Sequence, residues 1–108
     1  MLRVDFGPNR AIGPGKIKLL EAIDQSGSIS QAGRTLGMSY RRAWLLVEEL
    51  NKLFGEPLVS AHPGGVRGGG ATLTPMGEQV IGLYRAAESK MREAAAREID
   101  GIERVLAR

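Results

Sequence analysis

The chain has 108 residues, 43% of them apolar and 25% charged, so a globular protein with one modest core is expected. It contains no cysteine, which excludes disulfides, thiolate metal sites and cysteine nucleophiles. The net charge of +3 lies in residues 1–74, which hold nine Lys or Arg against six Asp or Glu; this suits a polyanion partner, although a solvated basic face is an equally common cause.

The N-terminal segment predicts a strand followed by a helix. Leu2, Val4 and Phe6 alternate with polar residues, in the period of two that is typical of a half-buried strand. Apolar residues at helical spacing then predict a helix over 16–25. No apolar segment suits a signal peptide or a membrane span, so we expect a cytoplasmic protein with no membrane partner.

Two helices joined by a tight turn are predicted over 28–54. Ser28 and Gln31 fit a capping box at the start of the first helix. Gly37 supplies the positive φ of the turn, and Ser39 is a good N-cap for the second helix. Small residues at Ala32 and Ala43, with larger apolar residues at helical spacing around them, allow the two helices to cross closely. The pattern predicts a helix-turn-helix.

The start of the second helix holds the main candidate DNA contacts. Tyr40, Arg41 and Arg42 follow the capping Ser39, and no acid occurs in 28–47. A basic helix of this kind suits the major groove, where an arginine fork to guanine is the commonest specific contact. Either arginine could instead bind phosphate, which positions the protein without reading sequence. Tyr40 could contact a phosphate or a sugar.

Two further candidates have strong alternatives. Trp44 lies one turn further along the second helix, where packing against neighbouring helices is expected more than contact with a base. Arg34, in the first helix, is a candidate phosphate contact, and surface solvation explains it equally well. A generic helical hairpin is the alternative for the whole segment, and the basic, acid-free content favours DNA binding over it.

A glycine-rich loop is predicted between short strands over 58–62 and 71–73. Residues 64–70 hold five glycines and Arg67. A nucleotide-binding P-loop needs Lys-Ser or Lys-Thr after its glycines, and neither follows here. We expect instead the wing of a winged helix, with Arg67 at its tip against DNA, and a flexible hairpin is the alternative.

A single long helix is predicted from Pro75 to Arg108, with Thr74 as its cap. Its apolar residues recur in steps of three and four, as in a coiled coil. Because so small a head can cover only the first turns, we expect the rest to pair with a second copy in a symmetric homodimer. The predicted dimerisation residues are Val80, Tyr84, Ala87, Met91, Ile99, Ile102 and Leu106.

No catalytic, metal or cofactor site is predicted. His62 is the only histidine and has no cysteine or carboxylate pair beside it, so an enzyme is not expected. Helix N-termini near Ser28 and Thr74 could attract a small oxyanion, but no convergent cationic pocket is predicted there, and this remains a minor alternative.

The predicted fold is mainly α with a small β-wing: a winged helix-turn-helix over 1–74 and a long C-terminal dimerisation helix over 75–108. Five segments resemble the DNA-binding domain of the ModE family of molybdate-responsive regulators, which is similar to the LysR-type winged helix. The resemblance implies a homodimer on a palindromic operator, with 39–42 at the start of the recognition helix and a wing at 64–70. The segments that carry it are 13–17, 28–32, 38–44, the glycine-rich loop and 73–77.

The leading hypothesis is a sequence-specific, ModE/LysR-like transcriptional regulator without its own molybdate-sensing domain. In the ModE family an oxyanion-binding domain follows the long helix, whereas this sequence stops at Arg108, which puts molybdate or any other small-molecule effector in doubt. The alternative is a protein-interaction module that heterodimerises with a full-length regulator and modulates it.

Overall fold

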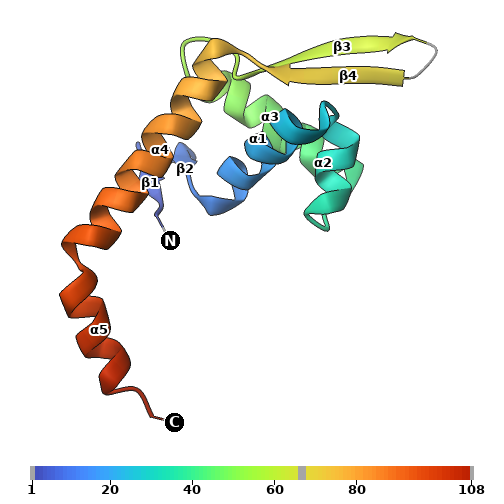
Figure 1. Ribbon diagram of the computed structural model, residues 1–108. Coiled ribbons are helices and arrows are strands. Elements are labelled where there is room, and N and C mark those ends of the chain that lie inside the picture. The colour runs from blue at the N-terminus through green and yellow to red at the C-terminus, as the bar shows by residue number, and fades with distance from the viewer. Residues whose placement is uncertain (1, 66–67, 108) are drawn as a thin grey trace.

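The computed structural model describes residues 2–65 and 68–107, and side-chain placement is described outside 63–69. The described elements are a small N-terminal hairpin, three helices, a longer hairpin and two C-terminal helices (Figure 1). In chain order they are β1 (Val4–Asp5), β2 (Ala11–Ile12), α1 (Pro14–Ser26), α2 (Ile29–Thr35), α3 (Tyr40–Leu53), β3 (Val59–Gly65), β4 (Gly68–Leu73), α4 (Pro75–Ala94) and α5 (Ala96–Arg104). This is the predicted winged helix-turn-helix, mainly helical with a long α4.

The hydrophobic core is built around α1. Ile17, Leu20 and Ile23 on this helix have no exposed surface. The helix packs against α2, α3, α4 and β4, so these four elements share one common support (Figure 1). The apolar spacing that predicted this helix therefore marks its buried face.

The N-terminal hairpin differs from the single strand predicted over 2–6. Its ordered pairing covers only two residues a side, with Val4 opposite Ile12. The chain turns back early because Gly7 and Asn9 both adopt positive φ, at 129° and 58°. The sequence did not predict β2, since two residues are too few to show a period.

The β3–β4 hairpin runs from the start of α4 toward the side of α3 and α2, as a wing does (Figure 1). Val59 pairs with Leu73 and His62 with Gly70, so the strands continue further into the glycine-rich segment than predicted. Asn51 on α3 fixes the base of the hairpin, because its amide oxygen accepts from the backbone N–H of Leu58 at 2.8 Å and of Val59 at 3.0 Å.

The C-terminal segment is not the unbroken helix predicted to Arg108. It is interrupted at Ala95, which has φ −103° and ψ 9°, and α5 ends at Arg104. No proline or glycine lies at the break, and α5 has no buried residue. Among the described residues, no helix combines the length and apolarity that crossing a membrane requires.

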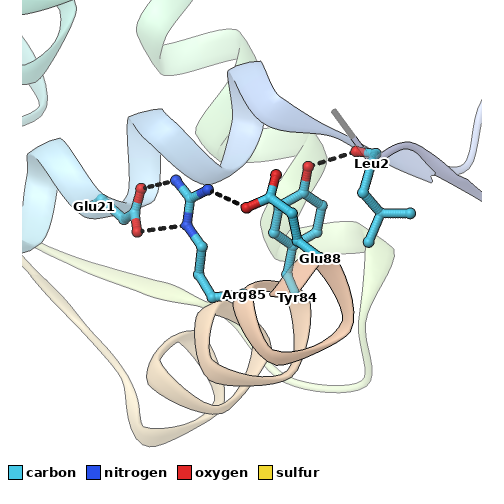
Figure 2. Close-up of polar contacts among 5 residues, drawn as sticks. All are labelled: Leu2, Glu21, Tyr84, Arg85 and Glu88. Atoms are coloured by element: carbon cyan, nitrogen blue, oxygen red, sulfur yellow. Dashed lines mark hydrogen bonds and ion pairs between the residues drawn. The ribbon is translucent and has the colours of Figure 1, made fainter. Parts of the chain in front are cut away.

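The middle of α4 is fixed to the head by polar contacts (Figure 2). The Tyr84 hydroxyl donates to the backbone carbonyl of Leu2. Arg85 donates from Nε to Glu21 on α1 at 3.0 Å and from Nη1 to Glu88 at 2.8 Å. These bonds set the direction in which α4 leaves the head.

Candidate nucleic-acid interface

The predicted helix-turn-helix is present, with both serine caps in place. The Ser28 hydroxyl accepts from the backbone N–H of Gln31 at 3.1 Å, and the Ser39 hydroxyl accepts from that of Arg42 at 3.1 Å. Gly37 has φ 70°, as the turn requires. The reciprocal half of the capping box is wrong, because the Ser28 N–H donates to the Ser26 hydroxyl and not to the Gln31 side chain.

Small residues allow α2 and α3 to cross closely. Ala32 and Ala43 have no exposed surface. A Cβ placed on Gly33 would lie only 3.2 Å from that of Ala43, tighter than most real contacts. This packing fixes the angle at which α3 projects from the head.

The start of α3 presents its side chains to solvent. Arg41 and Arg42 are exposed, and Tyr40 is 59% exposed. The opposite side of the helix, with Ala43 and Val47, is buried in the core. Because successive residues differ by about 100° around a helix, Arg41 lies well away from that buried side. Leu45, 48% exposed on the same outer side, is a possible groove contact that the sequence analysis did not single out.

Trp44 combines packing with a place beside the exposed side. Its ring meets that of Tyr40 edge to face, with centroids 6.1 Å apart, and the residue packs partly buried against the core. Its indole Nε1–H is buried without a partner in the described structure. With Tyr40 it lines a small cleft of about 130 Å³ between α2, α3 and the wing. The geometry favours packing for Trp44, and its DNA contact remains a prediction.

The positive charge of this segment is not neutralised. Arg34 donates to the Ser30 hydroxyl at 3.1 Å and to the Gln31 amide oxygen at 2.8 Å, neither of which carries charge. Among the described residues, Arg34, Arg41 and Arg42 form no ion pair. Their charges are therefore free to meet an anion. Arg67, the predicted wing contact, lies outside the described residues.

The predicted dimerisation residues divide into two groups. Val80 and Tyr84 are buried in the core of the chain itself, so their surface is already covered. The residues further along α4 and α5 are exposed. Met91 is 56% exposed, Ile99 43%, Ile102 62% and Leu106 56%, and Ala87 is exposed as well.

Comparison with known sequences assigns the helix-turn-helix and the wing to one family. Residues 15–78 match the model described as "Bacterial regulatory helix-turn-helix protein, lysR family". The chain is 49% identical over 78 residues to the molybdenum-pterin-binding protein MopB of Rhodobacter capsulatus, covering 72% of this chain and 29% of that protein. It is 38% identical over 96 residues to the molybdenum transport protein ModE of Azotobacter vinelandii, covering 89% of this chain and 36% of that protein.

The name of a further relative includes DNA binding. The chain is 46% identical over 71 residues to the DNA-binding transcriptional dual regulator ModE of Escherichia coli K12, covering 66% of this chain and 27% of that protein. The chain thus spans about a third of these relatives' length, and the similarity is to ModE regulators and Mop proteins. Among solved structures, full-length LTTR LysG of Corynebacterium glutamicum with bound effector Arg matches 87% of this chain and 30% of its own, with TM-score 0.61 and 23% identity, which shows a shared fold.

Proposed function

Because the chain belongs to the LysR family of bacterial regulatory helix-turn-helix proteins, we propose that it is a sequence-specific transcriptional regulator that binds a palindromic operator as a homodimer. It carries a LysR-type DNA-binding domain related to ModE, from a family of regulators and not of enzymes. Residues 1–74 bind DNA in this proposal, and residues 75–108 dimerise. The names of the MopB and ModE relatives concern molybdenum, so we place the controlled genes in molybdenum transport or use.

One observation carries the DNA-binding proposal: the start of α3 is exposed and positively charged without compensation. Arg41 and Arg42 project from a helix whose other side is buried, and neither forms an ion pair among the described residues. A guanidinium in this position can bind two acceptors of a guanine edge or one phosphate. Tyr40 adds a hydroxyl at the same end of the helix.

The exposed apolar residues of α4 and α5 support the homodimer. From Met91 onward they lie beyond the head's core, and α5 has no buried residue. An apolar helical stripe left in water favours a partner, and a second copy related by two-fold symmetry is the simplest. Such a dimer presents two α3 helices to successive major grooves, roughly 34 Å apart.

Selection of bound duplexes from a random DNA pool tests the proposal. We expect an inverted repeat whose half-sites are spaced by whole helical turns. On the selected duplex, Arg41→Ala should weaken binding by about 1–3 kcal/mol for each half-site, and its unfolding free energy should change by less than about 1 kcal/mol because the residue is exposed. Arg92→Ala, an exposed arginine on α4, is the matched control and should bind like the parent.

Two outcomes would contradict the proposal. If Arg41→Ala and Arg42→Ala both bound the selected duplex as tightly as the parent, α3 would not be the helix in the groove. If the pool yielded no preferred sequence and the protein ran as a monomer on sizing chromatography, the protein-interaction alternative would replace the regulator.

A further inference from the structure

A cleft whose charged lining residues are mainly basic lies between the N-terminal hairpin, the first turn of α1 and one side of α3. Its volume is about 580 Å³. Four basic side chains line it, and Glu49 is the acid among the described residues of its wall. We propose that this cleft holds a backbone phosphate of DNA, beside the groove that α3 enters; the inference rests on the proposed function. The basic side chains are Arg3, Arg10, Lys16 and Arg42.

Two of these four charges are available to a ligand. Arg3 lies 3.2 Å from the Asp5 carboxylate, and Lys16 donates to the carbonyl of Ala11 at 2.9 Å. Lys16 also lies 3.6 Å from Glu49. Arg10 and Arg42 form no ion pair among the described residues. They are therefore the cations that we assign to the phosphate.

Arg10 is held by an ordered turn. Its backbone N–H donates to the Gly7 carbonyl at 3.1 Å, and its own carbonyl accepts from Phe6 at 2.6 Å. Asn9, the residue before it, is in the left-handed conformation that asparagine tolerates. The next residue, Ala11, is already in β2 and is buried. The backbone of Arg10 is thus fixed, so binding has mainly its side chain to order.

Arg42 joins this cleft to the proposed recognition helix. Leu46 and Glu49, one and two turns further along α3, line the cleft with it. Tyr40 and Trp44 instead line the small cleft toward the wing. The outer side of α3, with Arg41, therefore lies between a basic flank at the large cleft and an aromatic flank at the small cleft. A helix in the major groove has a phosphate backbone on each side, so a basic flank is where backbone contacts are expected.

The phosphate oxyanion could come from DNA or from free phosphate, and the cleft favours DNA. Arg3, Arg10 and Arg42 are all exposed, so water and salt screen each of them. A single small anion gains little from such hydrated charges. A polyanion gains more, because each neutralised phosphate also releases condensed counterions.

The test measures the salt dependence of DNA binding by Arg10→Ala. Affinity is measured from about 50 to 200 mM salt, on the selected duplex and on one of arbitrary sequence. The variant should bind both several-fold more weakly and keep the sequence preference. It should reduce the slope of log K against log salt by about 0.9 for each protomer, and so by about 1.8 for the bound homodimer. Arg10→Lys should retain most of the slope, and Arg97→Ala, on exposed α5, should match the parent.

If Arg10→Ala had the same slope of log K against log salt as the parent, the inference would be overturned. The proposed function would stay intact, provided Arg41→Ala still loses specific binding. A second arm compares melting in inorganic phosphate and in chloride at equal ionic strength, without DNA. We expect no phosphate-specific rise in the melting temperature of the parent. A rise that Arg10→Ala abolishes would overturn the DNA assignment and make the cleft a site for free phosphate.

Discussion

The guanidinium of Arg85 on α4 bonds both oxygens of the Glu21 carboxylate on α1 (Figure 2). The same guanidinium donates to Glu88, three residues further along α4. The proposed dimer surface begins just beyond, at Ala87, whereas α1 supports the proposed DNA-binding helices. This bridge therefore fixes the angle between the part of the chain that would read DNA and the part that would pair with a second copy.

Removing this bridge should weaken the fold modestly. Arg85→Ala is expected to lower the unfolding free energy by about 1 kcal/mol. A surface ion pair with two parallel hydrogen bonds stabilises a fold only slightly more than an exposed pair with one. The side chain of Arg85 is 40% exposed, so solvent screens part of the attraction. Urea denaturation at neutral pH measures the loss. Arg92→Ala, also on α4, is the control, and an equal loss in both variants would assign the effect to the helix itself.

The bridge should also make stability depend on acid pH. The hydrogen bond from Arg85 holds the pKa of Glu88 below its ordinary value of 4.5, and the pKa of Arg85 is raised, chiefly by its bond to Glu21, so the arginine stays charged. A carboxyl whose folded pKa is depressed stabilises the fold above its unfolded pKa. The contribution of Glu88 is lost as the pH falls from about 4.5, its ordinary pKa, through its lower pKa in the folded protein.

Denaturation at a series of pH values from neutral into this acid range checks the prediction. Glu88→Gln should be less stable than the parent at neutral pH and should lose less stability on acidification. Parallel curves for the two proteins would show that Glu88 has the same pKa in the folded and unfolded chain.

Local chemistry made the helix-turn-helix predictable. The caps Ser28 and Ser39 and the turn at Gly37 act within a few residues, so their residue types predicted the bonds that the structure shows. The cleft that pairs Arg10 with Arg42 could not be predicted, because folding brings together residues that are distant in sequence. The break at Ala95 was not predicted either, since alanine is the best helix former.

The close approach of α4 to the base of the wing should make Gly77 irreplaceable. A Cβ at this position would lie 2.3 Å from the Leu58 carbonyl oxygen, a backbone atom that cannot rotate away. Gly77→Ala should therefore cost at least about 2 kcal/mol of unfolding free energy, because packed backbone must shift. Gly82→Ala, on the same helix with nothing within 4 Å, should instead stabilise by up to about 1 kcal/mol. Thermal and urea denaturation compare the two, and similar effects would contradict the packing described.

Two substitutions at Trp44 should separate packing from DNA contact. Trp44→Phe keeps most of the ring's contacts and removes the buried N–H that has no partner, so we expect a cost below about 1 kcal/mol. Trp44→Ala should cost about 2–3 kcal/mol, since it also empties partly buried space. If Trp44 serves packing, Trp44→Phe binds the selected duplex like the parent. A large loss of affinity in this stably folded variant would instead assign the indole to DNA.

The dimer should depend on the apolar residues beyond the head. Ile99 and Ile102 are 43% and 62% exposed on α5, which has no buried residue, so replacing both by serine leaves the core of the head untouched. The double variant should shift from dimer to monomer in sedimentation at micromolar concentration and should lose any concentration dependence of its melting temperature. Arg97→Ser with Arg104→Ser places the same residue type at other exposed positions of α5 and should remain dimeric. A parent that sediments as a monomer would contradict the proposed homodimer, whereas an isoleucine variant that still pairs would move the dimer contact away from α5.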